Sequence, residues 1–269
     1  MSFPKIGEMK TVGKKTERLN GLIRILKTKN GATVKELAEH VGVSEMTIRR
    51  DLKFLHENNI VNNVYGATIY NPANRIQQVD RRYELRQEVF VHEDEKIRIG
   101  RAAAKLIEPN DVVVIDAGTT TEKMAAYIAE DVSVTILCNS TNVLSQLTDK
   151  NMPLIFAGGY YHAGTQMFES EEGLALINRT RTTKAFVSAA GVHRDLGVTC
   201  ANHYEIPPKK AMIKSSLQKI LLADAAKFDL VKSAVFAELK EFNTIITDKT
   251  LSQEWCSYIE AQKIKLILV

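Results

Sequence analysis

A group of small polar residues follows directly after an apolar run and has the composition of an anion-binding turn. The apolar run 112–115 is typical of a buried strand, and the chain continues Asp116-Ala-Gly-Thr-Thr-Thr121. Where such a turn opens a helix, unpaired backbone N–H groups and the positive end of the helix dipole attract an anion, and threonine hydroxyls add donors. Asp116 is expected to hold a sugar hydroxyl. The residues expected to hold a phosphate are Gly118, Thr119, Thr120 and Thr121.

The turn lacks the lysine and the spacing of a nucleoside-triphosphate loop, so ATP is not indicated. In the alternative interpretation the threonines only cap the helix and the glycine only makes the turn. Other apolar runs also end in small or polar residues, at the sheet edge where open α/β folds bind ligands. The further residues expected at this ligand site are Asn139, Ser140, Gly158, Gly159, Gly191, Glu205, Lys209 and Lys227. Glu205 and Lys209 are four apart at the start of an expected helix, where they either enter one cleft or form a surface ion pair.

A second pattern, between residues 33 and 58, is that of a helix-turn-helix. Thr33 and Glu36 have the spacing of a capping box that begins a short helix. Gly42 can adopt the left-handed conformation of a tight turn, and Ser44 caps a second helix. In DNA-binding proteins with this motif, the second helix enters the major groove with its N-terminal residues at the base edges.

The side chains at the start of that second helix suit contacts to both phosphates and bases. Arg49 can reach guanine or phosphate, Met46 can touch a thymine methyl group, and Thr47 can bond a phosphate oxygen. The residues expected to contact DNA are Thr33, Ser44, Glu45, Met46, Thr47, Arg49, Arg50, Lys53 and Tyr65. The alternative is a three-helix protein-interaction module, which the basic pair and the turn signature disfavour.

The excess positive charge of the chain lies in its first quarter. Residues 1–66 hold 12 Lys or Arg and 7 Asp or Glu, whereas residues 67–269 hold 24 and 25. A basic module joined to a near-neutral body is typical of a nucleic-acid-binding head.

These residues require two kinds of scaffold. Helices are expected at 16–28, 33–41 and 44–58, followed by a β-hairpin around Gly66 that completes a winged helix-turn-helix. The expected domains are a basic N-terminal arm at 1–15, a winged helix-turn-helix at 16–70, a linker at 71–92 and an α/β ligand-sensing domain at 93–269.

The second scaffold is a Rossmann-like α/β domain. A helix is expected at 93–107, with Ile97, Ala104 and Ile107 facing the interior. Continuous apolar runs indicate strands buried on both faces, as in a parallel sheet. The expected strands lie at 112–115, 132–137, 154–156, 185–187, 220–222, 245–246 and 264–269.

The composition of the 269-residue chain excludes several classes of protein. No apolar run approaches the ~20 residues that span a bilayer, and the N-terminal residues lack the apolar core of a signal peptide. The three cysteines are far apart and odd in number, which argues against a disulfide framework. No metal-binding spacing of histidines and cysteines occurs. A cytoplasmic protein with no cofactor, no metal and no membrane partner is expected.

The run Arg18-x3-Leu22-x3-Leu26-x17-Ser44-x2-Thr47-Ile-Arg-Arg-Asp-Leu52 resembles the signature of the DeoR family of bacterial transcriptional regulators. The strand ends between residues 93 and 248 resemble, in the same order, the C-terminal sensor domain of that family, which is related to ribose-5-phosphate isomerase. Within the family, residues 188–193 and 197–200 are most similar to the subgroup that regulates the deoxyribose operon.

The resemblance implies a DNA-binding repressor of a sugar or nucleoside catabolic operon, without enzymatic activity. Its partners would be double-stranded operator DNA and a phosphorylated sugar effector, such as deoxyribose 5-phosphate, that releases it. At least a homodimer is expected, since one winged helix rarely gives sufficient specificity. The alternative is a sugar-phosphate isomerase-like enzyme with a fused DNA-binding head, because Asp116, Glu205 and Lys209 offer acid and base groups.

Overall fold

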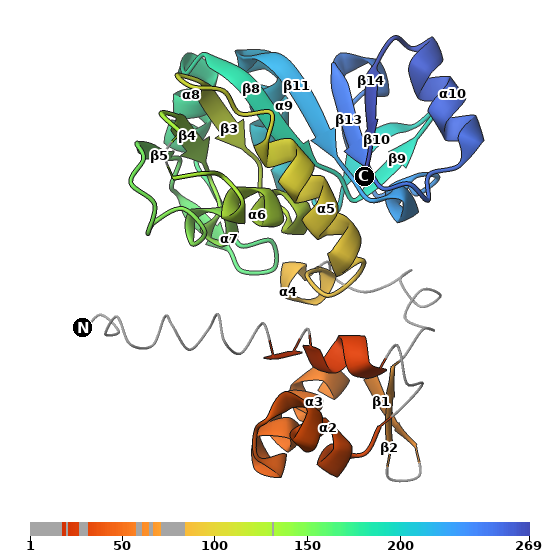
Figure 1. Ribbon diagram of the computed structural model, residues 1–269. Coiled ribbons are helices and arrows are strands. Elements are labelled where there is room, and N and C mark those ends of the chain that lie inside the picture. Colours follow the sequence, from red (N-terminus) through yellow and green to blue (C-terminus); the bar gives the residue numbers. More distant parts are fainter. Residues whose placement is uncertain are drawn as a thin grey trace. The chain divides into compact units, whose positions relative to one another are not determined.

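The chain folds into two compact units, Met1–Arg82 (unit 1) and Tyr83–Val269 (unit 2), in the computed structural model shown in Figure 1. The structure describes residues 18–19, 21–26, 32–57, 61–64, 67–70, 84–130 and 132–269. The expected basic arm, Tyr65 and residues 71–83 of the expected linker lie outside the described residues.

Unit 1 is a helical core with a two-stranded antiparallel sheet. Residues 18–19 and 21–26 are helical. They are followed by α2 (Val34–Val41), α3 (Glu45–Glu57), β1 (Val61–Val64) and β2 (Ala67–Tyr70). The two strands pair with Val61 opposite Tyr70. The buried apolar side chains of this unit include Leu19, Leu22, Leu26, Leu37, Ile48, Leu52, Leu55 and Val61. This arrangement is the predicted winged helix-turn-helix.

Local hydrogen bonds that the sequence predicted begin α2 and α3, and a glycine ends α2. The Glu36 N–H donates to Thr33 Oγ1 at 3.3 Å, and the Thr33 N–H donates to Glu36 Oε2 at 2.7 Å, which completes the capping box. Gly42 ends α2 with φ of 71°, the left-handed region. The Thr47 N–H donates to Ser44 Oγ at 3.3 Å. These predictions are confirmed.

One ion pair, beside the buried apolar side chains of α3, links this helix to the first helix. Asp51, of which only 3% of the side chain is exposed, accepts hydrogen bonds from Arg18 Nε at 2.5 Å and Nη2 at 3.2 Å. The two-pronged contact holds the first helix against α3. Together with buried Ile48, Leu52 and Leu55, it sets which side of α3 faces the interior.

Unit 2 is built on a seven-stranded sheet in which every pair of neighbouring strands is parallel. Its order is β14-β13-β11-β8-β3-β4-β5. The strands are β3 (Val112–Ile115), β4 (Thr135–Cys138), β5 (Leu154–Phe156), β8 (Thr182–Ser188), β11 (Ser216–Leu222), β13 (Thr244–Thr247) and β14 (Lys265–Leu268). Each corresponds to one of the seven apolar runs in the sequence, so the predicted parallel sheet is confirmed.

Helices cover both faces of this sheet, and two separate cores result. One core packs α5 (Glu93–Ala104), α6 (Thr119–Ala126) and α7 (Thr141–Leu144) on one face. The other packs α8 (Glu171–Arg179), α9 (Ile206–Ser215) and α10 (Gln253–Ala261) on the opposite face. Neighbouring strand residues such as Val113 and Val114 contribute to different cores, because side chains alternate across a strand. In Figure 1, α5 crosses in front of the sheet.

Several elements of unit 2 had no clear signal in the sequence. A hairpin joins β6 (Tyr160–His162) to β7 (Met167–Glu169), and a small antiparallel sheet has the order β12-β10-β9. Its strands are β9 (Gly191–His193), β10 (Gly197–Cys200) and β12 (Ala234–Ala237). They are short and only partly apolar, and β10 pairs with β12 across more than 30 residues of chain.

The inward face of α5 differs from the prediction. The buried residues of this helix are Lys96, Ile99, Gly100 and Ala103, whereas Ile97 and Ala104 are only partly buried. A Cβ on Gly100 would lie 2.7 Å from the backbone N of Met124. The backbone of α6 therefore packs against this glycine and decides which side of α5 faces inward. Ile107, just beyond the helix, is buried as expected.

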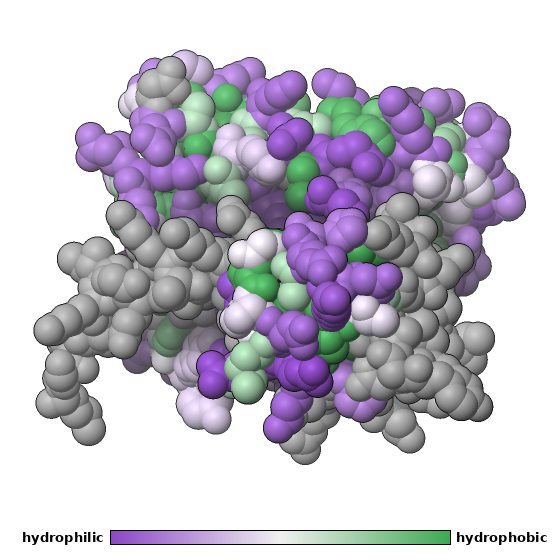
Figure 2. Space-filling view, turned by 60° about the horizontal axis from the view of Figure 1, so that its bottom comes forward, coloured by the Kyte–Doolittle hydropathy of each residue, from purple (hydrophilic) through white to green (hydrophobic). Residues whose placement is uncertain are grey.

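In the view of Figure 2, hydrophilic residues predominate on the described surface, and hydrophobic residues form separate small patches. Among the described residues, no helix combines the length and the apolar character needed to cross a membrane.

Replacing Arg18 with alanine is expected to destabilise unit 1 by about 2 kcal/mol, because Asp51 would remain buried without its charged donor. The measurement is the urea dependence of hydrogen exchange at the amides of α3. Lys35→Ala removes the same charge from an exposed position and serves as control. Equal stability of the two variants would contradict the anchoring role of the ion pair.

Candidate functional site

The exposed face of α3 carries most of the residues that the sequence assigned to DNA. Its solvent-exposed members are Glu45, Met46, Arg49, Arg50 and Lys53. They recur over successive turns opposite the buried Ile48, Leu52 and Leu55. Three cations and one thioether therefore share one helical surface, which is the arrangement that a major groove can accept.

Three other predicted DNA contacts, Thr33, Ser44 and Thr47, make hydrogen bonds within the motif. Thr33 Oγ1 donates to Glu36 Oε2 at 2.9 Å, and the hydroxyls of Ser44 and Thr47 lie 3.0 Å apart. Arg49 pairs with Glu45 at 3.3 Å, and both side chains are at least half exposed. Such an exposed pair is weak, so the guanidinium can exchange Glu45 for a base or a phosphate.

A cavity in unit 2 opens at the carboxyl ends of three adjacent strands, β3, β8 and β11. The order of the sheet reverses between β3 and β8, since β4 and β5 continue on one side and the later strands on the other. Open α/β sheets bind their ligands at such a switch point. The empty space is about 530 Å³, open solvent included.

Six of the predicted ligand residues line this cavity: Gly118, Thr119, Thr120, Glu205, Lys209 and Lys227. The structure thus brings together the turn before α6, the start of α9 and the residues after β11. A Cβ on Gly118 would overlap Ser188, so this glycine allows the turn to approach the end of β8.

The remaining predicted ligand residues do not line the cavity: Asp116, Thr121, Asn139, Ser140, Gly158, Gly159 and Gly191. Thr121 is fully buried and donates to the carbonyl of Gly118 at 3.0 Å. Gly159 has φ of 144° and approaches the backbone of Glu169, while Gly191 approaches that of Leu230. These two glycines allow close packing of the backbone.

Gly158 and Asn139 form hydrogen bonds with other segments of unit 2, whereas one oxygen each of Asn139 and Ser140 has no partner among the described residues. Gly158 accepts a hydrogen bond from Ser170 Oγ at 2.8 Å through its carbonyl. Asn139 Nδ2 donates to the carbonyl of Phe168 at 3.2 Å. The Asn139 Oδ1 and Ser140 Oγ atoms are buried without a hydrogen-bond partner among the described residues.

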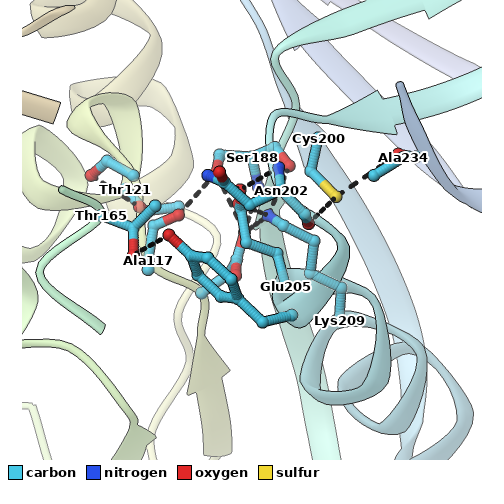
Figure 3. Close-up of polar contacts among 12 residues, drawn as sticks. Ala117, Thr121, Thr165, Ser188, Cys200, Asn202, Glu205, Lys209 and Ala234 are labelled. Atoms are coloured by element: carbon cyan, nitrogen blue, oxygen red, sulfur yellow. Dashed lines mark hydrogen bonds and ion pairs between the residues drawn. The ribbon is translucent and has the colours of Figure 1, made fainter. Parts of the chain in front are cut away.

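Asp116 forms a buried ion pair with Lys209, which lines the cavity. Asp116 Oδ2 accepts hydrogen bonds from Lys209 Nζ, from the Ser188 N–H at 3.0 Å and from Ser188 Oγ at 2.9 Å. Lys209 also donates to the carbonyl of Ser188 at 3.1 Å. In Figure 3, Lys209 extends from α9 towards Ser188, with Glu205 beside it. Asp116 therefore has a role that the sequence did not predict, which is to join the ends of β3 and β8 to α9.

The pKa values of Lys209 and of neighbouring Glu205 are both shifted. Burial alone would lower the pKa of the Lys209 ammonium, but Asp116 and Glu205 outweigh it and raise the pKa. Burial raises the pKa of Glu205, and this exceeds the opposing effect of Lys209, whose Nζ lies 4.0 Å away. Glu205 also accepts hydrogen bonds from the N–H and Nδ2 of Asn202 at 2.9 and 3.0 Å.

Two of the charged residues that line the cavity, Glu88 and Lys96, were missed in the sequence. Lys227 Nζ donates to Glu88 Oε2 at 3.0 Å, and Lys96 Nζ donates to the carbonyl of Glu88 at 2.5 Å. Burial, assisted by nearby Lys227, lowers the pKa of Lys96 to about 8; Glu88 and Asp224 oppose this shift, and Lys123 adds to it. Glu88 lies in the expected linker and Lys96 in an expected helix, and neither segment carries a local binding motif.

No group of three or more histidines, cysteines, aspartates or glutamates in the described parts of the chain is arranged to hold a metal ion.

The two units define a class of protein: a helix-turn-helix transcriptional regulator with an α/β sensor domain. Residues 18–73 match the DeoR-like helix-turn-helix domain, and residues 91–249 match the DeoR C terminal sensor domain. The chain belongs to the DeoR family and is a DNA-binding transcriptional repressor.

Named relatives extend over nearly the whole chain. The chain is 32% identical to the deoxyribose operon repressor of Escherichia coli (strain K12), over 94% of this chain and 98% of the relative. It is 30% identical to the transcriptional regulator IolR of Bacillus subtilis (strain 168), over 88% and 92%. It is also 30% identical to the transcriptional repressor GlcR of that strain, over 94% and 95%. These relatives do not favour the isomerase alternative.

Solved structures show weaker likeness. Ribose 5-phosphate isomerase A of Methanocaldococcus jannaschii matches with a TM-score of 0.39 and 15% identity, over 51% of this chain and 55% of that one. The probable sor operon regulator of Shigella flexneri matches with a TM-score of 0.41 and 12% identity, over 60% and 88%. Likeness at this level does not bear on function.

The lowered pKa of Lys96 predicts a pH dependence of stability. Between pH 8 and about 10.5 the unfolded chain retains a proton that folded Lys96 has lost, so the free energy of unfolding rises with pH across this window. The advantage of the wild type over Lys96→Met is therefore expected to increase from pH 8 to pH 10. The measurement is urea unfolding followed by the fluorescence of Trp255, the single tryptophan of the sequence, which is buried in α10.

Lys105→Met, at an exposed lysine, should show no such trend. Parallel pH profiles for the wild type and Lys96→Met would contradict the assigned burial of the charge.

Proposed function

We propose that this protein represses a sugar or nucleoside catabolic operon by binding operator DNA through α3, and that a phosphorylated sugar in the cavity of unit 2 releases it. The observation that carries the proposal is the pairing of an exposed basic face on α3 with a switch-point cavity lined by lysines and by a Gly-Thr-Thr turn. The names of the relatives support it, since they include repressors of a deoxyribose operon and of a lactose phosphotransferase system.

In this proposal the phosphate group lies at the first turn of α6. The first N–H groups of a helix have no acceptor within it, and the helix dipole favours an anion there. Thr119 and Thr120 add hydroxyl donors, and Lys227 faces the same space. Glu205 would accept a hydrogen bond from a sugar hydroxyl. Deoxyribose 5-phosphate is the first candidate because of the similarity to the deoxyribose operon repressor.

DNA recognition would combine base and backbone contacts. Arg49 and Arg50 supply guanidinium groups for guanine or phosphate, and Met46, which is 63% exposed, suits a thymine methyl group. We propose at least a dimer, since operator half-sites follow the symmetry of the protein.

We further propose that the protein is cytoplasmic and does not turn its effector over. An isomerase needs a carboxylate that can reach the substrate proton. Asp116 Oδ2 already accepts three hydrogen bonds, and Glu205 accepts two from Asn202. The hydrogen bonds of both carboxylates are therefore used within the protein.

Arg49→Ala is expected to weaken binding to an operator fragment, selected by the wild-type protein from random sequences, by about 1–3 kcal/mol. The loss follows from one missing base or phosphate contact and is measured by fluorescence anisotropy at fixed salt. Lys263→Ala removes an equal charge from an exposed position of unit 2 and should bind as the wild type does. Equal affinity of all three proteins would exclude Arg49 from the interface.

Thr120→Val is expected to weaken binding of deoxyribose 5-phosphate about tenfold while operator affinity stays unchanged, because one hydroxyl donor to a charged group is lost. Calorimetry gives the affinity, and the sugar-phosphate concentration that releases the operator gives the functional effect. Thr148→Val, at an exposed threonine, is the control. Unaltered release by Thr120→Val would place the phosphate elsewhere.

A further inference from the structure

We propose that Lys227 and Lys96 form an anion subsite in the cavity, that the Glu88 carboxylate is its built-in occupant, and that the anionic group of the effector displaces Glu88 and so frees α4 (Leu85–Glu88). The inference rests on the proposed function and deepens it. It proposes that the anionic group of the effector acts on the chain and that α4 is the segment that responds.

The first step is the geometry of the subsite. Glu88 Oε2 lies 3.0 Å from Lys227 Nζ, across 139 residues of chain, and 16% of each side chain is exposed. Lys96 and Lys227 come from different elements and both line the cavity. Part of the effector site is thus already filled by a carboxylate of the protein itself.

The second step is the balance of charge. Lys96 in α5 is buried, and its Nζ donates to the backbone carbonyl of Glu88 and not to the carboxylate. Glu88 therefore supplies a single carboxylate near the two ammonium groups of Lys96 and Lys227. Asp224 adds a second carboxylate at the cavity, and its Oδ2 has no hydrogen-bond partner among the described residues. Burial raises the pKa of Glu88, but Lys227 and Lys96 outweigh it and keep the group ionised. A phosphate carries more charge and more acceptor oxygens than Glu88 and can engage both lysines.

The third step is what holds α4. Leu85 is 1% exposed, and its N–H donates to the carbonyl of Gly164 at 2.7 Å. The other polar contacts described for this helix with distant parts of the chain are those that Glu88 makes with Lys96 and Lys227. Loss of the carboxylate contact therefore removes the charged anchor of α4.

The fourth step links the subsite to regulation. In the sequence, α4 begins at Leu85, three residues after Arg82, the last residue of unit 1. An anion and the Glu88 carboxylate cannot occupy the subsite together. The effector therefore binds more tightly when α4 is released from Lys227 than when Glu88 is paired with it. Such a difference in affinity is what a ligand needs in order to shift a conformational equilibrium.

The competition predicts a change in affinity. The apparent affinity of a ligand is its intrinsic affinity multiplied by the fraction of molecules whose site is open. If Glu88 fills the subsite in about nine of ten molecules, the anion binds about tenfold more weakly than it would to an open subsite. Removing the carboxylate charge restores that factor.

The experiment is calorimetric titration of the full chain with inorganic phosphate, a probe that is independent of the identity of the sugar. Glu88→Gln is expected to bind phosphate about tenfold more tightly than the wild type. Glu84→Gln removes the same charge just before α4, outside the ion pair with Lys227, and should match the wild type. Equal or weaker binding by Glu88→Gln, or no binding to either protein, overturns the proposal.

A second readout does not depend on the variants. In the wild type, phosphate is expected to speed hydrogen exchange at the amides of residues 84–91, and in Glu88→Gln the exchange should be fast without it. Unchanged exchange in a wild type that binds phosphate overturns the displacement of α4. Neither measurement involves operator DNA, so failure of sugar phosphates to release the operator would count against the proposed function and not against this subsite.

Discussion

The ammonium group of Lys209, buried at the reversal point of a parallel sheet, is the constraint on which unit 2 depends. A buried cation is costly unless it is paired and hydrogen-bonded. Asp116 and the carbonyl of Ser188 meet that requirement, and in doing so they hold together the ends of β3 and β8 and the start of α9. These three elements also contribute part of the wall of the cavity. The position of one charge thus fixes the geometry in which a ligand can be bound.

Unit 1 uses the same principle on a smaller scale. Asp51 is buried on α3, and Arg18 satisfies it from the first helix. Pairs of this kind mainly determine orientation, since apolar side chains of similar size could bury as much surface. In this case the orientation directs the basic face of α3 to solvent.

Arg49, proposed to bind DNA, and Lys227, proposed to bind the effector, are each already paired with a carboxylate of the protein. Arg49 is paired with Glu45, and Lys227 with Glu88. A ligand with more negative charge or better geometry than a single carboxylate can replace each partner. The two pairs differ in burial: the pair on α3 is exposed and weak, whereas the pair in the cavity is largely enclosed and stronger. Exchange at the first costs the protein little structure, while exchange at the second would release a helix.

Local patterns of the sequence determined the helix-turn-helix, the seven strands of the parallel sheet and the fold class. The capping box of Thr33, the turn at Gly42 and the seven apolar strands depend on hydrogen bonds and periodicities that span a few residues, so they can be read from neighbours in the chain. The family signature added the sensor domain.

Only the tertiary structure decided how the sites are built. Lys209 meets Asp116 across 93 residues and Lys227 meets Glu88 across 139, distances that no local pattern encodes. The inward face of α5 was mispredicted because the backbone of α6 packs on Gly100, and Gly159 and Gly191 serve packing because other backbone segments approach them. Residue types reveal which chemistry is available, but the long-range packing of strands and helices selects which charged groups meet, because burial makes every unpaired charge costly.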